Sequence, residues 1–300
     1  MSRALLAALA KLLEGVDQSP DRTCSASAFT IAQRQALEDL GRKTGALKVR
    51  IQGRGNVYQV IELEMLRSHL RSLRPQRAGD VDHSIPIRAS NIARSRNSKG
   101  HAHGHEFHYL LVKAITDVTK WVDKSDGQRP DFDLGQTTRA AGAGALAIRE
   151  DDDWHSDQPL WLVENQALFD RLDWLPRDAS GTVAYYAGHL PARLLSWIGH
   201  AERSPKVIIF PDYDGVGLLN YAKLLECSHG RCELWLIPNW KVLLDTYGSN
   251  QIWQNTRSEF EAALVKIKEL SVPDEVLLLC AALSRDGLAL EHEAVWLSID

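Results

Sequence analysis

The chain of 300 residues lacks the sequence features of disulfide-rich secreted proteins and of membrane-spanning proteins. It holds only four cysteines, in no paired framework of the kind that staples small secreted domains, so we expect a reducing, cytoplasmic location. It has no apolar run long enough to span a bilayer. The apolar N-terminal stretch 4–13 is interrupted by Lys11 and followed by Glu14, which predicts an amphipathic helix and neither a signal peptide nor membrane contact.

Length and composition indicate two globular domains. Hydrophobic residues make up 44% and charged residues 25% of the chain, which is ordinary for a globular protein of this length. Residues 75–105 are rich in Pro, Arg, Ser, Asn, Gly and His, and a helix is predicted from about Glu106 to Trp121. Gly, Ser and Asp accumulate over 123–157, including the acidic run Glu150–Asp153. We therefore predict a boundary between domains 1–150 and 151–300.

The net charge of −4 conceals two halves of opposite sign. Residues 151–300 carry 12 Lys and Arg against 23 Asp and Glu, whereas residues 1–150 carry 23 basic against 16 acidic side chains. Between Arg42 and Lys99 there are 13 basic and 4 acidic residues. This asymmetry indicates a polyanion-binding N-terminal half and a cation-binding C-terminal half; a solvated charged surface is the alternative.

The N-terminal half has the pattern of a winged helix-turn-helix. Apolar residues on a helical period run from residue 25 to Gly45, and Leu63–Leu73 repeats that period. Between them, residues 47–51 and 57–61 alternate as two strands around a turn at 52–56, which predicts a basic hairpin, or wing. The alternative is a small α+β domain with a basic surface. The side chains expected to contact DNA are Arg50, Arg54, Arg88, Arg94, Arg96 and Lys99.

The C-terminal half has an α/β rhythm. Short apolar strands are predicted at 160–163, 183–186, 207–210 and 233–237, with helices near 166–172, 190–201 and 216–226. Continuous apolar strands separated by helices predict a parallel sheet covered on both faces.

Three acids follow two of these strands. Glu164 follows the first, and Asp212 and Asp214 follow the third. Ligand sites of parallel sheets form at the carboxyl ends of strands, and carboxylates that share one rim repel each other unless a cation lies between them. Oxygen ligands suit Mg²⁺ or Mn²⁺, and Gly215 and Gly217 would let backbone approach the metal or a phosphate. Taken singly, Glu164 could be a helix-start acid and the two aspartates turn residues.

Val163-Glu164-Asn165 followed by Asp212-Tyr213-Asp214-Gly215-Val216-Gly217 resembles the Toprim pattern of topoisomerases, primases and nucleases. The narrower resemblance is to the A subunit of topoisomerase VI and to the JetD or MksG nuclease subunit of the Wadjet and Mks plasmid-defence systems. Residues 92–99, ending in Ser98-Lys99, resemble a basic segment of the latter proteins. Residues 287–293 resemble their closing leucine-glutamate-x-glutamate segment.

This resemblance implies a winged helix joined to a Toprim α/β domain that hydrolyses DNA. Glu164, Asp212 and Asp214 would bind Mg²⁺ or Mn²⁺, Lys99 would contact the scissile phosphate, and Glu291 and Glu293 would support the metals. It also implies a homodimer that acts on double-stranded DNA delivered by an SMC and kleisin complex of the condensin type.

The chain departs from the family in two places. Gly215 stands where relatives often have proline, and no arginine–tyrosine–tyrosine signature of the topoisomerase nucleophile is present. Tyr58 lies in the expected wing, the wrong place for a nucleophile, which favours hydrolysis by a metal-activated water. A topoisomerase-like transesterase and a DNA-binding adaptor with a degenerate Toprim site remain the alternatives.

A histidine cluster at residues 101, 103, 105 and 108 has two interpretations. In a helix, His101, His105 and His108 would share a face and could bind zinc. The whole cluster, His103 included, follows a basic loop, so contact with phosphate is an equally simple interpretation.

Overall fold

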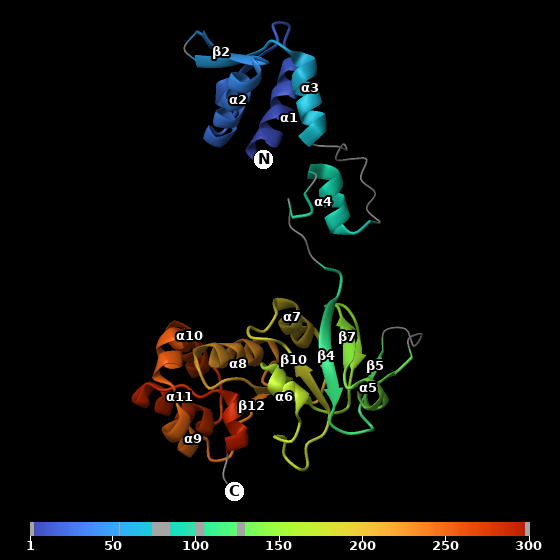
Figure 1. Cartoon of the computed structure of the whole chain (residues 1–300), viewed down its shortest axis with the longest axis vertical. Coiled ribbons are helices and arrows are strands. Elements are labelled where there is room, and N and C mark those ends of the chain that lie inside the picture. The colour runs from blue at the N-terminus through green and yellow to red at the C-terminus, as the bar shows by residue number, and fades with distance from the viewer. Residues whose placement is uncertain are drawn as a thin grey trace. The chain divides into compact units, whose positions relative to one another are not determined.

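The computed structural model divides the chain into two units, Met1–His105 and Glu106–Asp300 (Figure 1). It describes residues 3–53, 55–73, 85–95, 97–99, 105–124 and 130–297. Each unit has its own cluster of buried apolar side chains. None of the helices within these described ranges is both long and apolar enough to cross a membrane.

The N-terminal unit combines helices with a three-stranded antiparallel sheet of order β1-β3-β2. Its elements in chain order are α1 (Arg3–Asp17), β1 (Thr23–Ser25), a 3-10 turn η1 (Ala26–Ala28), α2 (Ile31–Thr44), β2 (Leu47–Gln52), β3 (Gly55–Val60), α3 (Leu63–Leu73) and α4 (Ile87–Ser95). The predicted amphipathic N-terminal helix, the hairpin and the helix at 63–73 are confirmed.

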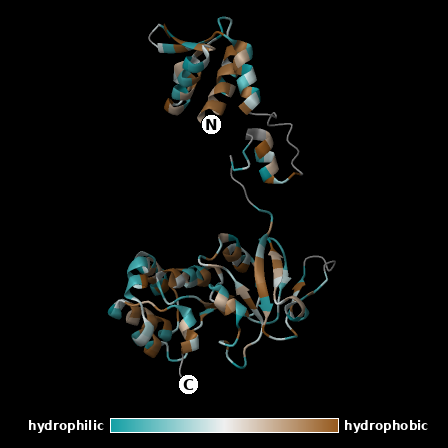
Figure 2. Ribbon diagram, viewed as in Figure 1, coloured by the Kyte–Doolittle hydropathy of each residue, from teal (hydrophilic) through white to brown (hydrophobic). Residues whose placement is uncertain are grey.

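Local sequence signals set the ends of α2. Thr30 and Gln33 form a reciprocal capping box at its start. Gly45 ends it in the left-handed conformation, with φ of 66°, which glycine adopts without a steric penalty. Hydrophobic residues run along α1, α2 and α3 (Figure 2). They form one cluster with the sheet, in which Leu37 and Tyr58 are fully buried.

The C-terminal unit is an α/β structure built on a six-stranded mixed sheet of order β12-β11-β9-β10-β4-β7. Its strands are β4 (His108–Ala114), β7 (Gly144–Ile148), β9 (Leu160–Val163), β10 (Thr182–Tyr185), β11 (Val207–Phe210) and β12 (Cys232–Leu234). The helices that contact the sheet include α5 (Leu134–Ala141), α6 (Gln166–Asp170), α7 (Ala192–His200) and α8 (Gly215–Cys227). A small sheet of order β6-β5-β8 joins β5 (Lys120–Asp123), β6 (Phe132–Asp133) and β8 (Trp154–His155).

The four strands predicted in this half are confirmed as mutually parallel neighbours, β12-β11-β9-β10. The sheet as a whole is not parallel, because β4 pairs antiparallel with both β10 and β7. The helix predicted over 106–121 is wrong. β4 occupies most of that segment, and its burial alternates from Leu110 to Ala114, the period of a strand with one covered face.

The domain boundary predicted near residue 150 therefore moves to residue 105. β4 and β7 lie before residue 150, yet they are hydrogen-bonded into the same sheet as β10. With this boundary the charge asymmetry sharpens, because residues 1–105 carry 17 basic and 9 acidic side chains and residues 106–300 carry 18 and 30.

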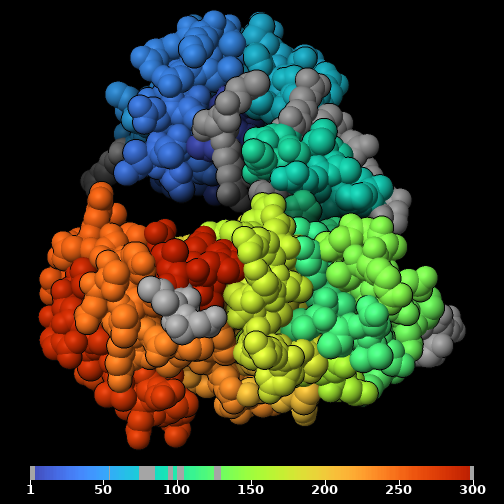
Figure 3. Space-filling model, turned by 60° about the horizontal axis from the view of Figure 1, so that its bottom comes forward, coloured from blue at the N-terminus to red at the C-terminus, as the bar shows by residue number. Residues whose placement is uncertain are grey.

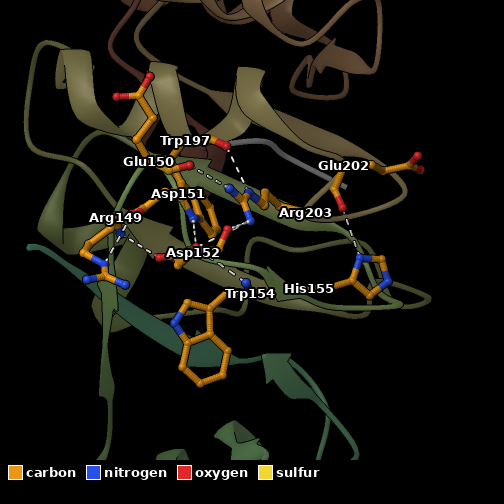
Figure 4. Close-up of polar contacts among 9 residues, drawn as sticks. All are labelled: Arg149, Glu150, Asp151, Asp152, Trp154, His155, Trp197, Glu202 and Arg203. Carbon is orange, nitrogen blue, oxygen red and sulfur yellow. Dashed lines mark hydrogen bonds and ion pairs between the residues drawn. The ribbon is translucent and has the colours of Figure 1, made fainter. Parts of the chain in front are cut away.

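Asp152, in the acidic run that suggested a domain boundary, lies in a buried junction (Figure 4). Asp152 and Arg203 form an ion pair of 3.4 Å in which each side chain is at most 3% exposed. Arg203 also donates to the carbonyl oxygens of Glu150, Asp152 and Trp197, and Trp197 donates its indole N–H to Asp152 over 2.6 Å. The run thus ties the loop after β7 to the end of α7.

Three helices and a closing 3-10 turn complete the unit. They are α9 (Trp240–Tyr247), α10 (Asn250–Glu269), α11 (Asp274–Asp286) and η2 (His292–Leu297). The closing segment returns to the sheet through two backbone hydrogen bonds between Tyr213 and Leu290, of 2.8 and 3.1 Å. In the space-filling view it lies in red between the orange helices and the yellow segment after β9, where Trp296 donates to Asp173 over 3.0 Å (Figure 3).

Candidate metal centre

Three adjacent parallel strands place the candidate residues at one edge of the sheet. Val163, the last residue of β9, is in register with Tyr185 of β10 and with Phe210 of β11. Glu164, Tyr186 and the Pro211-Asp212 pair follow these three residues directly. The expectation that the acids after the first and third predicted strands meet at one rim is therefore met by the strand order.

Glu164 is largely buried at this edge. Burial, and then the nearby charges of Asp212 and Asp214, raise its pKa to about 7, against the partly opposing effect of His292. The hydroxyl of Tyr186 donates to Glu164 Oε2 over 3.3 Å. Tyr186 is itself buried, and this burial together with the carboxylates holds its pKa well above the ordinary value.

Asp212 connects β11 to the closing segment. Its Oδ1 accepts a hydrogen bond of 2.8 Å from the backbone N–H of His292. The imidazole Nδ1 of His292 lies 2.9 Å from the same oxygen. The Tyr213–Leu290 backbone pairing fixes this approach, so residues 80 positions apart in the chain meet at the end of one strand.

Asp214 has a structural role besides any catalytic one. It is the N-cap of α8, and its Oδ1 accepts a hydrogen bond of 2.8 Å from the backbone N–H of Gly217. Burial raises its pKa to about 6, helped by the charge of Asp212 and opposed by the backbone hydrogen bonds. The N-terminus of α8, with its partial positive charge, also points to this edge.

The glycines after Asp214 serve packing. A Cβ on Gly215 would lie 1.8 Å from the carbonyl oxygen of Thr256 in α10, and one on Gly217 would lie 2.0 Å from that of Asp212. That these glycines admit a metal or a phosphate stays a prediction. In the structure, Gly215 lets α8 approach α10 at backbone distance.

The ligand atoms that could hold an ion are those of Asp212, His292 and Glu293, which lie within 4.8 Å of one another. Glu293 is positioned by the side-chain amide of Asn165, the residue after Glu164. His292 is fully buried, and neither ring nitrogen has a hydrogen-bond partner in the described part of the chain. Carboxylates with an unsatisfied buried imidazole form a donor set that fits a divalent cation.

His292 is the residue that sequence reasoning missed. Burial disfavours its charged form, but the carboxylates of Asp212, Glu293 and Glu164 outweigh burial and raise its pKa. In the sequence, His292 stands between Glu291 and Glu293, at the unspecified position of the leucine-glutamate-x-glutamate segment. Of these two predicted ligands, Glu293 lies in the cluster, whereas Glu291 is exposed and outside it.

The predicted DNA-binding side chains belong to the N-terminal unit. Arg50 is exposed on β2, and Arg88 is exposed on α4. Lys99 is exposed beside Asn97, whose side chain accepts its backbone N–H over 2.9 Å, and Asn91 of α4 donates to Ser98 over 3.2 Å. The rest, Arg54, Arg96 and the side chain of Arg94, lie outside the described residues.

The histidine cluster is only partly described. His101 and His103 lie outside the described residues, while His105 is exposed and His108 begins β4. The segment from His108 is a strand, so the helical face that would have aligned these side chains does not continue through it. Burial lowers the pKa of His108.

Comparison with protein-family models finds no match for this chain, and comparison with curated proteins finds none.

Proposed function

We propose that the chain is a metal-dependent DNA endonuclease that hydrolyses phosphodiester bonds at the edge formed by β9 and β11. The observation that carries the proposal is the electrostatic proximity of Glu164, Asp212 and Asp214, with the buried imidazole of His292 and the carboxylate of Glu293 beside Asp212. The pKa of Glu164 is raised to about 7 and that of Asp214 to about 6 by burial and mutual repulsion. Carboxylates that are buried together and repel one another are stabilised by a bound cation, so this arrangement favours cation binding.

Asp212, Glu293 and His292 would hold the cation, and Glu164 and Asp214 lie electrostatically close to it. Mg²⁺ or Mn²⁺ bound there would supply an activated water and charge stabilisation at a phosphate. Around it, Tyr186 orients the Glu164 carboxylate and Asn165 orients that of Glu293. Glu164, whose pKa lies near neutrality, can accept a proton from an attacking water.

The topology supports the Toprim interpretation of the C-terminal unit. The lone glutamate follows β9, the first of the four mutually parallel strands, and the Asp-x-Asp pair follows β11 beside it. The N-terminal order of helix, strand, 3-10 turn, helix and antiparallel hairpin supports a winged helix in which η1 takes the place of a full second helix.

Double-stranded DNA is the proposed substrate because residues 1–105 carry 17 basic against 9 acidic side chains. Arg50 and Arg88 would contact phosphates mainly without regard to sequence, and Lys99 would contact the scissile phosphate. The condensin-like partner complex and the homodimer rest on the resemblance alone.

Tyrosine chemistry is disfavoured by burial. Tyr58 is fully buried, and burial followed by Glu38 raises its pKa to about 12. The hydroxyl of Tyr186 is bonded to Glu164, and its pKa lies well above the ordinary value. Neither of these two tyrosines provides a ready nucleophile, which favours hydrolysis over attack by either of them.

The test is cleavage of supercoiled plasmid DNA by the purified chain with Mg²⁺ or Mn²⁺, repeated with any partner complex that co-purifies. Asp212→Asn keeps an acceptor for the N–H of His292 but removes the charge, and we expect cleavage to fall by roughly 100-fold or more. Glu291→Gln, at an exposed neighbour outside the cluster, should keep activity.

Linear or nicked products with free ends from the wild type alone would support the nuclease. Equal cleavage by Asp212→Asn would remove the assignment of the site. DNA binding without cleavage under every condition would favour the adaptor, and a covalent protein–DNA adduct would favour the transesterase.

A further inference from the structure

His292 is a buried histidine whose polar atoms are left unsatisfied by the fold. Its side chain has no exposed surface, and both ring nitrogens lack hydrogen bonds from the described residues. A buried imidazole normally receives at least one partner, because an unpaired polar group is unfavourable away from water. The described residues bring the carboxylates of Asp212 and Glu293 close to the ring, and a cation shared with them would give the imidazole a partner.

Each ring nitrogen lies near a carboxylate, and one of the two nitrogens can act as the ligand, because the lone pairs of an imidazole diverge. Nδ1 lies 2.9 Å from Asp212 Oδ1 in a direction outside hydrogen-bond geometry, and Nε2 lies 3.7 Å from Glu293 Oε2. Adjacent ligands of an octahedral cation with bonds of about 2.1 Å are separated by roughly 3 Å. The Nδ1–Asp212 separation matches that spacing, whereas a hydrogen bond between the two would need a different orientation.

The position of the imidazole is fixed before any ion binds. The backbone N–H of His292 is held by Asp212 Oδ1, and the preceding Leu290 is paired with Tyr213 through the backbone. The imidazole packs against the ring of Phe210, the last residue of β11, with centroids 5.3 Å apart. A ligand held in this way is presented to a cation at little entropic cost.

We propose that His292 is a nitrogen ligand, with Asp212 and Glu293, and that it makes this centre select Mn²⁺ over Mg²⁺. The inference concerns the metal of the site proposed above and rests on that function. Mg²⁺ prefers oxygen ligands and retains water, whereas Mn²⁺ accepts carboxylate oxygens and imidazole together. The two carboxylates of Asp212 and Glu293 are ligands that suit Mn²⁺ as well as Mg²⁺, so the imidazole is the donor that distinguishes these two cations.

The test uses the full chain with Mn²⁺ alone and reads the metal directly. Electron spin echo spectroscopy of bound Mn²⁺ should show modulation from a histidine nitrogen, and the pattern should change when the wild type is labelled with ¹⁵N-histidine. The modulation should disappear in His292→Phe, which keeps a ring beside Phe210 but has no ligand atom. His200→Phe, at an exposed histidine at the end of α7, is the matched control.

Affinities measured by titration provide the second reading. We expect the wild type to bind Mn²⁺ at least about 100-fold more tightly than Mg²⁺. His292→Phe should lose about 10-fold or more in Mn²⁺ affinity and change that for Mg²⁺ by less than about 3-fold. Where His292→Phe fails to fold, as judged by circular dichroism, His292→Gln takes its place, and the ¹⁵N experiment needs no variant.

The inference is overturned if wild-type Mn²⁺ shows no nitrogen modulation, if the modulation survives in His292→Phe, or if both metals lose affinity equally. These readings do not depend on DNA cleavage. If Mn²⁺ is bound through a nitrogen but DNA is not cleaved, the proposed nuclease activity is wrong and the proposed metal site stands. If DNA is cleaved but no nitrogen binds Mn²⁺, only the proposed role of His292 is wrong.

Discussion

Glu164 shows how a single carboxyl can oppose the stability of the metal-free fold. Its pKa lies at about 7 in the folded chain, above the ordinary value of 4.5, because burial and the neighbouring aspartates disfavour its charged form. The native state therefore binds more protons than the unfolded state between these values. The free energy of unfolding contributed by this group is greatest at low pH and decreases as the pH rises through 7.

Glu164→Gln removes that charge while keeping an acceptor for the hydroxyl of Tyr186. In the presence of a chelator we expect the variant to be more stable than the wild type at pH 8 by about 1–3 kcal/mol, and the difference to shrink toward pH 5. Urea unfolding at both pH values measures it. Glu291→Gln, at an exposed acid, should show no such dependence on pH; a variant that is less stable than the wild type at pH 8 would contradict the raised pKa of Glu164.

At the scale of elements, contacts between segments far apart in the chain hold the C-terminal unit together. The Tyr213–Leu290 pairing brings the closing segment to the metal centre, and the Asp152–Arg203 pair holds the acidic run against α7. Gly215 allows α8 to approach α10 at backbone distance. Each contact joins elements whose local sequences give no sign of the other.

Removal of Arg203 should expose the importance of this junction. Arg203→Met leaves the buried Asp152 carboxylate without its counter-charge and removes the guanidinium donor from three carbonyl oxygens, so we expect the free energy of unfolding to fall by about 3–5 kcal/mol. Lys206→Met, which breaks the half-exposed 2.6 Å pair with Glu233, should cost less than about 1 kcal/mol. Chemical denaturation measures both losses. Equal losses in the two variants would show that the buried ion pair stabilises the fold no more than the half-exposed one.

At the scale of the whole molecule, the two units carry net charges of opposite sign. The C-terminal unit carries 30 acidic and 18 basic side chains, so we expect the N-terminal unit to make the proposed contact with DNA. Its hairpin and α4 present Arg50 and Arg88 to solvent. An affinity built on phosphate contacts must weaken as salt increases, because bound counterions are released.

The double substitution Arg50→Ala with Arg88→Ala should weaken binding to duplex DNA and lower the slope of log affinity against log salt by about 2. Fluorescence anisotropy with a labelled duplex over a range of salt concentrations measures both quantities. Arg257→Ala changes an exposed arginine of the acidic unit and should leave the slope unchanged. If the double variant keeps the wild-type slope, Arg50 and Arg88 do not contact the DNA phosphates.

The sequence by itself determined the elements whose signals are local. The strands 160–163 and 207–210 are continuous apolar runs, and α2 is bounded by a capping box and a glycine. Because strand ends in a parallel sheet share one edge, the sequence also placed Glu164 beside Asp212. These features depend on neighbours a few residues apart or on a general property of parallel sheets.

Only the tertiary structure decided the features that rest on long-range pairing. β4 was taken for a helix because its apolar run suits either period, and antiparallel pairing with β10 and β7 settles it as a strand. Likewise, nothing near His292 in the chain distinguishes it from a surface residue. Its burial against Asp212, 80 residues away, arises from the Tyr213–Leu290 bridge, since the position of a side chain in a site depends on the packing of elements that the local sequence does not encode.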